Sequence, residues 1–170
     1  AYLNSYYQTG LKNLLDVAVL EHVEVHRQLK VGTAFRKVDE IPFDFTRRRM
    51  SVVVAERDHS PLLICKGAVE EMLAVCTRVR HGVVDEALSD DLLARIRQVT
   101  AAFNAEGLRV VAVAARPMLE NRDTYSLADE QALTLIGYVA FLDPPKESTA
   151  PALKALAAHG VVVKVLTGDN

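Results

Sequence analysis

The sequence predicts an α+β fold, in which an antiparallel sheet of about six strands is flanked by helices. Short apolar and β-branched runs at 33–41, 51–56 and 62–65 follow one another with only polar turns between them, which indicates a meander rather than βαβ units. An amphipathic run at 89–105 has helical spacing. The continuous β-branched run at 161–166 is instead typical of a strand buried on both faces of a parallel sheet. We therefore expect an α+β domain followed by the start of an α/β unit.

Helices are expected before the sheet and directly after its third strand. The tyrosines and the leucine of 1–10 could form one apolar face of a short helix. Residues 13–27 repeat apolar side chains at i, i+3 and i+4 and predict a longer helix, with Asp16 early in it, where the helix dipole favours a carboxylate. The apolar positions of 66–76 also have helical spacing, so we expect a helix there.

The second half of this domain is expected to contain a hairpin, a long helix and two strands. Residues 78–84 resemble a hairpin with His81-Gly82 at its turn. Ser89 is placed to cap the helix that extends to Ala105. Buried strands are expected at 108–115 and 131–142, with a polar loop between them.

Two prolines mark a boundary after the last of these strands. Pro144 and Pro145 lack a backbone N–H and stiffen the chain, so strand pairing cannot continue through them. Beyond them, Ser148 is placed to cap a helix that extends to about His159. The chain therefore passes at this point from the first domain into a second, incomplete unit.

Composition narrows the class of protein. The 170 residues include 20 basic and 22 acidic side chains, a formal net charge of -2, and this balance argues against a nucleic-acid partner. No apolar run approaches the ~18 residues that span a bilayer, and no signal-peptide pattern begins the chain. Cys65 and Cys76 lie in apolar contexts without a Cys-x-x-Cys motif, so we expect reduced, buried thiols in a cytosolic domain. Both ends resemble cuts in a longer protein.

Lys66 and Gly67 stand where a strand-like run changes to helical spacing. Free backbone N–H groups at a helix start attract anions, glycine permits close approach of a ligand, and lysine adds a cation. This pattern suggests an anion or nucleotide site. The alternative is an ordinary strand–helix junction with a solvated lysine.

A second candidate lies between the first two strands, where Phe43 and Phe45 precede three arginines at 47–49. An aromatic face can stack on a base while neighbouring cations meet phosphates. The alternative is a charged strand edge with the phenylalanines in the core. Arg109 interrupts the strand at 108–115 and is either a phosphate ligand or an ordinary charge at the mouth of the sheet.

Taken together, these motifs and those near the end of the chain resemble the motifs of one protein family. Asp143-Pro144-Pro145 followed by Thr167-Gly168-Asp169-Asn170 resembles the passage in P-type ATPases where the chain leaves the nucleotide-binding domain and re-enters the phosphorylation domain. Pro42-Phe43-Asp44 with Arg48 and Met50 after it, Lys66-Gly67-Ala68 and Leu108-Arg109-Val110 are similar to further family motifs, and all occur in family order. The resemblance covers essentially the whole chain. It implies a nucleotide-binding domain at 1–142, a hinge at 143–147 and a partial phosphorylation-domain segment at 148–170.

The resemblance also implies that the first domain binds ATP. Adenine would stack on Phe43, Asp16 would face its amino group, and Arg48 and Arg109 would face the phosphates. Lys66 and Gly67 would form the wall and floor of the pocket, where a bulky side chain at Gly67 would block entry. Asp16 is one methylene shorter than the glutamate usual in the family. Arg48 stands where lysine is frequent, and a guanidinium can bridge two phosphate oxygens.

Catalysis itself is expected to lie outside this chain. In the family the phosphorylated aspartate belongs to an Asp-Lys-Thr-Gly-Thr motif, and no such motif occurs here. The chain should therefore bind ATP without hydrolysing it. Thr167, Gly168 and Asp169 resemble the turn that helps to hold the phosphoryl group and its Mg²⁺, so Asp169 would act on the metal only indirectly and in the full-length enzyme.

The full-length protein implied by the resemblance is an ion-transporting ATPase of a membrane. The sequences of 6–13 and 143–156 look most like the bacterial magnesium-transporting branch. The expected partners are the phosphorylation and actuator domains and the transmembrane helices of the same polypeptide. The chain would then be a cytoplasmic domain at the bacterial inner membrane.

Two other functions are compatible with parts of the pattern. A regulatory or interaction domain of related fold would have lost nucleotide binding. A free-standing phosphatase of the haloacid-dehalogenase type is suggested only by 161–169, and it requires a nucleophilic aspartate motif that this sequence lacks.

Overall fold

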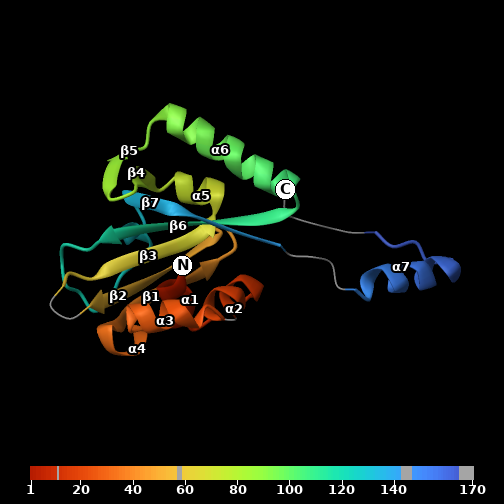
Figure 1. Ribbon diagram of the computed structural model, residues 1–170, viewed down its shortest axis with the longest axis horizontal. Coiled ribbons are helices and arrows are strands. Elements are labelled where there is room, and N and C mark those ends of the chain that lie inside the picture. Colours follow the sequence, from red (N-terminus) through yellow and green to blue (C-terminus); the bar gives the residue numbers. More distant parts are fainter. Residues whose placement is uncertain (11, 57–58, 143–146, 165–170) are drawn as a thin grey trace.

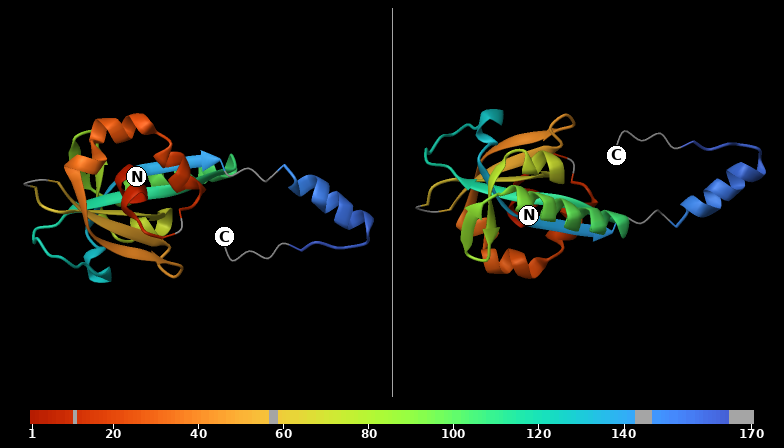
Figure 2. Two further views of the ribbon diagram at one scale, coloured as in Figure 1. Left: turned by 90° about the horizontal axis from the view of Figure 1, so that it is seen from below. Right: turned by 90° about the horizontal axis from the view of Figure 1, so that it is seen from above.

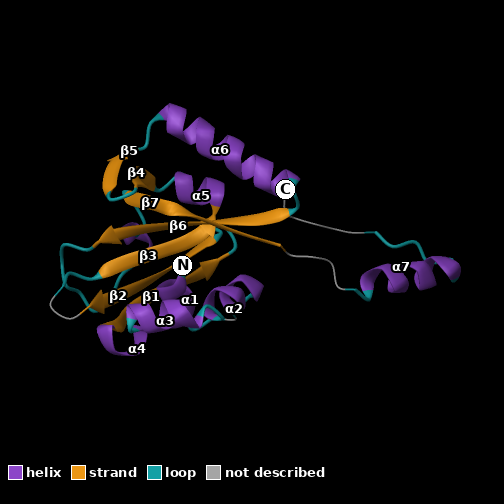
Figure 3. Ribbon diagram, in the orientation of Figure 1, coloured by secondary structure: helices purple, strands orange, loops and turns teal. Residues whose placement is uncertain are grey.

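The computed structural model describes residues 1–10, 12–56, 59–142 and 147–164. A seven-stranded sheet forms its centre, and helices cover both faces (Figure 1). Figure 3 separates the helices from the strands by colour. In chain order the elements are α1 (Tyr2–Tyr7), α2 (Leu14–Leu20), α3 (Val23–Leu29), α4 (Val31–Ala34), β1 (Phe35–Asp44), β2 (Arg49–Glu56), β3 (Leu62–Ala68), α5 (Val69–Leu73), β4 (Cys76–His81), β5 (Val84–Ala87), α6 (Asp90–Ala105), β6 (Leu108–Pro117), the 3₁₀ helix η1 (Leu127–Asp129), β7 (Leu133–Leu142) and α7 (Thr149–Ala158).

The sheet is mixed rather than wholly antiparallel, so this part of the prediction was wrong. The strand order is β1-β2-β3-β6-β7-β4-β5, and every neighbouring pair is antiparallel except β4 and β7. The chain leaves β3 through α5 and enters β4 on the far side of β6 and β7. This crossover aligns β4 parallel to β7. The predicted meander at β1–β3 and the hairpin of β4 and β5 are present.

Strand β3 is longer than the sequence predicts, and the helix after it is shorter. Lys66, Gly67 and Ala68 belong to β3, and α5 covers only Val69–Leu73. In the register of the sheet, Gly67 lies between Arg49 of β2 and Ala112 of β6. Pairing on both sides therefore outweighs the local helical spacing. The change from strand to helix therefore comes after Lys66 and Gly67, at Ala68, which is the N-cap of α5.

The predicted helix at 13–27 is divided into two helices by Glu21 and His22. The first helix begins with a capping box, in which the Asn13 side chain accepts from the Asp16 N–H and the Asp16 carboxylate accepts from the Asn13 N–H. Val17, Val19 and Val25 have lower helix propensity than unbranched residues, which weakens a continuous helix.

The core has two parts, one on each face of the sheet. Alternate residues of β2 and β3, such as Val53, Leu63 and Cys65, pack with Met72 and Leu73 of α5. The remaining residues of these strands face the opposite helices, around Val52, Val54, Ile64 and Val113, with Leu3 and Tyr7 packed against them. Burial raises the pKa of the free Cys65 and Cys76 thiols to about 12.

The segment after β7 lies apart from the sheet. Helix α7 is exposed along its whole length, and Figures 1 and 2 show it well away from the other elements. The predicted strand at 161–166 is not formed over its described part, 161–164, because no other described strand lies beside it to supply hydrogen-bond partners. Asp143, Pro144, Pro145, Thr167, Gly168 and Asp169 lie outside the described residues. Among the described helices, none has the length and apolar character needed to cross a bilayer.

Candidate functional site

A cavity of about 1250 Å³ opens at one end of the sheet. Its walls come from the α1–α2 connection, the turn between β1 and β2, the end of β3 with α5, and the start of β6 beside α6. All six residues predicted to bind nucleotide line this one cavity. They are Asp16, Phe43, Arg48, Lys66, Gly67 and Arg109.

The turn between β1 and β2 carries Phe43 at its base and Arg48 at its end. The Asp44 carboxylate accepts from the backbone N–H groups of Thr46 (2.8 Å) and Arg47 (2.9 Å). These two backbone bonds, chiefly that from Arg47, hold the pKa of Asp44 below its usual range. The Arg48 N–H donates to the Asp44 carbonyl at 2.7 Å, and Arg48 has a left-handed φ of 47°. The turn is therefore an ordered structure.

Two aromatic rings stand at the mouth of the cavity. Phe43 is 51% exposed and Phe45 is 88% exposed, with their rings edge to face at 5.3 Å between centroids. The alternative that both phenylalanines belong to the core is therefore wrong. An exposed ring beside cations is suited to a flat base that carries anionic groups.

The side chains of the three consecutive arginines at 47–49 point in two directions. Arg47 and Arg49 donate to the carboxylate of Glu130, at 2.5 and 2.8 Å. Arg48 instead lines the cavity, where its guanidinium lies 3.8 Å from the Glu71 carboxylate. The sequence analysis did not identify Glu130, because it lies in a polar loop about eighty residues away and no local pattern marks it.

Lys66 does not act as a mobile surface cation, because its ammonium group is buried against the Asp16 carboxylate. Asp16 is 1% exposed and Lys66 is 6% exposed. The other Asp16 oxygen accepts from the Gln8 amide (2.7 Å) and from the Asn13 N–H (3.1 Å). The Lys66 ammonium also lies 3.2 Å from the Ser5 hydroxyl. The predicted alternative of a solvated lysine is therefore wrong.

Burial and pairing act in opposite directions on this pair. Burial raises the pKa of Asp16, but hydrogen bonds from Lys66, Ser5 and Gln8, together with the Lys66 charge, outweigh it and leave the pKa below its usual value. Burial lowers the pKa of Lys66, and the bond to Asp16 offsets only part of this effect. The Asp16 oxygens that the prediction assigned to the adenine amino group are thus already accepting hydrogen bonds from the protein.

The neighbouring strand β2 leaves no space for a side chain at Gly67. A Cβ at this position would lie 2.4 Å from the Arg49 Cβ and 2.6 Å from the Arg48 carbonyl oxygen. The Ala68 N–H donates to the same carbonyl at 3.0 Å, which holds the two strands together. A side chain at Gly67 would therefore displace the β1–β2 turn, an effect distinct from blocking the cavity.

Arg109 enters the cavity from the first residues of β6. It is exposed and pairs in register with Phe141 of β7, which also lines the cavity. Across the rim, Arg97 of α6 donates to Glu70 of α5 at 3.0 Å. The cavity side nearer to solvent thus holds guanidinium groups together with the Glu70 and Glu71 carboxylates, and the buried Lys66–Asp16 pair lies deeper.

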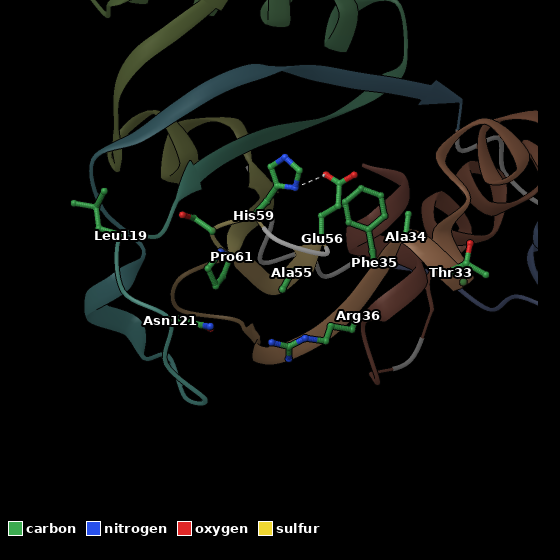
Figure 4. A pocket seen from close by; sticks show the side chains of 12 residues that line it. Thr33, Ala34, Phe35, Arg36, Ala55, Glu56, His59, Pro61, Leu119 and Asn121 are labelled. Carbon is green, nitrogen blue, oxygen red and sulfur yellow. Dashed lines mark ion pairs between the residues drawn. The ribbon is translucent and has the colours of Figure 1, made fainter.

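A second cavity of about 770 Å³ lies at the opposite end of the sheet and contains none of the predicted residues. Figure 4 shows Phe35, Arg36 and Glu56 on one side of it and Leu119 and Asn121 on the other. His59 Nδ1 and Glu56 Oε2 are 3.9 Å apart there. Among the described residues that line this cavity, there is no grouping of an exposed ring with several arginines or lysines.

Comparison with known proteins decides the family. The profile described as "P-type ATPase, cytoplasmic domain N" matches residues 9–148. The chain belongs to the P-type ATPase family. The chain is 56% identical over all 170 residues to the "Magnesium-transporting ATPase, P-type 1" of Salmonella typhimurium and to that of Escherichia coli K12. It is 29% identical over 141 residues to a calcium-transporting ATPase of Listeria monocytogenes.

These matches confirm the predicted family and the α+β fold of its N domain. The chain spans 19% of the length of the magnesium-transporting relatives, and its match covers 16% of the Listeria protein. In the described part of the N domain, no three His, Cys, Asp or Glu side chains are grouped so as to hold a metal ion.

Proposed function

We propose that this N domain binds ATP in the 1250 Å³ cavity and serves a magnesium-transporting P-type ATPase. The observation that carries the proposal is the convergence of six residues from positions 16 to 109 on one cavity. The identity of 56% to two magnesium-transporting ATPases supports the choice of ion. The exposed Phe43 ring, together with the guanidinium groups of Arg48 and Arg109, supports a ligand that combines a flat base with phosphates.

Each side chain has a proposed role. Adenine stacks on Phe43 beside Met50, and the guanidinium groups of Arg48 and Arg109 meet the phosphates. Lys66 and Gly67 form the wall and floor of the site. Asp16 acts mainly by holding Lys66, because a direct bond to the adenine amino group would compete with the donors that Asp16 already has.

In the full-length protein the γ-phosphate would point toward an aspartate outside this chain. The sequence contains no Asp-Lys-Thr-Gly-Thr motif, so we expect this chain to bind ATP without hydrolysing it. The segment Asp143–Pro145 would be a hinge that carries the nucleotide to the phosphorylation domain, since phosphoryl transfer depends on positioning and charge neutralisation. Residues 148–170, including Thr167, Gly168 and Asp169, would belong to that domain and act near the Mg²⁺ of the reaction.

We place the parent enzyme in the bacterial inner membrane, with this domain on the cytoplasmic side. Its partners would be the phosphorylation and actuator domains and the transmembrane helices of the same polypeptide. ATP binding in the N domain would then drive cation transport, with Mg²⁺ as the transported ion.

An NMR titration of the chain with Mg-ATP tests the proposal. We expect saturable shifts at the β1–β2 turn and at Lys66. Phe43→Ala should weaken binding by about 1–3 kcal/mol, which is about five- to 150-fold in Kd, because the base loses its stacking partner. Leu119→Ala removes an apolar side chain that is 99% exposed at the other cavity, and it should bind as the wild type does. Absence of saturable shifts in the wild type would refute ATP binding and favour the interaction-domain alternative.

A further inference from the structure

Glu130 lies outside the cavity but is bonded to the turn that forms one of its walls. The Glu130 side chain is 0% exposed, and the residue lies in the short connection between η1 and β7. Glu130, Arg47, Arg49 and Ser51 are all absent from the cavity lining. Any effect of Glu130 on a ligand in the cavity must therefore be indirect.

The Glu130 carboxylate joins both flanks of the turn. Its Oε2 accepts from Arg47 Nη1 (2.5 Å) and Arg49 Nε (2.8 Å), and its Oε1 accepts from the Ser51 hydroxyl (2.7 Å). Arg47 Nη2 also donates to the Pro42 carbonyl at 2.8 Å. Pro42 directly precedes Phe43, so one buried carboxylate is connected to both ends of the segment that carries Phe43 and Arg48.

These bonds also explain how three adjacent cations are separated. A buried carboxylate is stable only when it is paired, and two guanidinium groups with a hydroxyl satisfy it here. Gly67 leaves the space through which Arg49 passes, since a Cβ there would lie 2.4 Å from the Arg49 Cβ. With Arg47 and Arg49 drawn to Glu130, the left-handed backbone of Arg48 directs the remaining arginine to the cavity.

We propose that Glu130 is a positioning residue of the nucleotide site, which holds Arg47 and Arg49 so that the β1–β2 turn presents Phe43 and Arg48 to the ligand. This inference rests on the proposed function. It predicts that residues with no contact to ATP change its affinity through the turn.

Two variants of the 170-residue chain test this role, Glu130→Gln and Arg47→Gln. The control is Asp129→Asn, which alters the neighbouring carboxylate, whose hydrogen bonds come from Arg122 and Ser126 rather than from the turn. ATP affinity is measured by NMR titration at a temperature where each variant keeps the dispersed methyl spectrum of the wild type. We expect Kd to rise about tenfold in both test variants, a loss within the usual range for coupling between sites, and to stay within about twofold in the control.

A second readout separates positioning from general stability. Before nucleotide is added, the amide signals of 44–49 and the ring signals of Phe43 and Phe45 should shift in the test variants and stay unchanged in Asp129→Asn. A merely structural role would lower the unfolding midpoint but leave these signals and the Kd of the folded protein unaltered.

The outcomes decide between the two proposals. If Glu130→Gln does not fold, Arg47→Gln decides, because the Arg47 side chain is 16% exposed and its loss leaves Glu130 paired with Arg49 and Ser51. Wild-type affinity and wild-type turn signals in folded Arg47→Gln would overturn the positioning role and leave ATP binding intact. A wild-type chain that does not bind ATP would overturn the proposed function, and Glu130 would then have no nucleotide to position.

Discussion

Breaking the buried Lys66–Asp16 pair tests how the floor of the cavity is built. Both side chains are nearly inaccessible to water, so each single substitution leaves a buried charge without its partner. Asp16→Asn should lower the free energy of unfolding by about 3–5 kcal/mol. Lys66→Met should cost about 3 kcal/mol, the low end of this range, because Gln8 and Asn13 still donate to Asp16.

The double variant, Asp16→Asn with Lys66→Met, gives the decisive comparison. It removes both charges together, so its cost should be only about 1–3 kcal/mol, and about 3 kcal/mol or more of the summed single costs should disappear. Urea unfolding at pH 7 measures each value from the transition midpoint and slope. Additivity of the two single costs within about 0.5 kcal/mol would refute a coupled buried pair.

The same variants predict a pH dependence. The pKa of Asp16 in the folded protein lies below its usual value, so the unfolded chain takes up this proton at a higher pH than the folded chain does. The stabilising contribution is therefore complete above the unfolded pKa of about 3.9 and is lost as the pH falls through the folded value. The free energy of unfolding should fall less steeply below about pH 4 in Asp16→Asn than in the wild type. Parallel curves down to about pH 2 would contradict this assignment.

Two further predictions concern Gly67 and the thiols. Gly67→Ala should lower the free energy of unfolding by about 1–3 kcal/mol and shift the turn signals, because its Cβ would overlap the Arg49 Cβ, whereas Gly32→Ala has nothing within 4 Å and should be tolerated. Equal free energies of unfolding for both variants would contradict this, because they would show that β2 can move aside without loss of stability. Cys65 and Cys76, with pKa values of about 12, should carry about a thousandfold less thiolate at pH 8 in the folded chain than in the unfolded one. Alkylation followed by mass spectrometry checks this, and rapid labelling of the folded chain would contradict it.

The sequence predicted most of the sheet because local patterns define most of its strands. The β-branched run of β2 and the short apolar run of β3 are buried on both faces of the sheet, and such continuous apolar runs are visible without a structure. The extension of β3 through Lys66, Gly67 and Ala68 was not visible in this way. It depends on pairing with Arg49 and Ala112, which are distant in sequence, and the local helical spacing pointed to the opposite conclusion.

The family motifs named six residues that line the cavity, but the partners of these residues inside the protein were not predicted. Spacing alone could not show that Lys66 pairs with Asp16, since fifty residues separate them. It also could not show which of three consecutive arginines faces the cavity. The left-handed φ of Arg48 and the distant carboxylate of Glu130 decide that, and neither leaves a signal in the local sequence.

The charges around the cavity divide into two groups by burial, and this division has a physical basis. Asp16, Lys66 and Glu130 are buried and satisfied by partners within the protein, so they fix geometry and have little capacity to bind a ligand. Arg48 and Arg109 lie on the more exposed side, where a guanidinium exchanges partners at a small desolvation cost. If ATP binds as proposed, these exposed arginines should contact its phosphates, and the buried carboxylates should fix the position of the walls beside them.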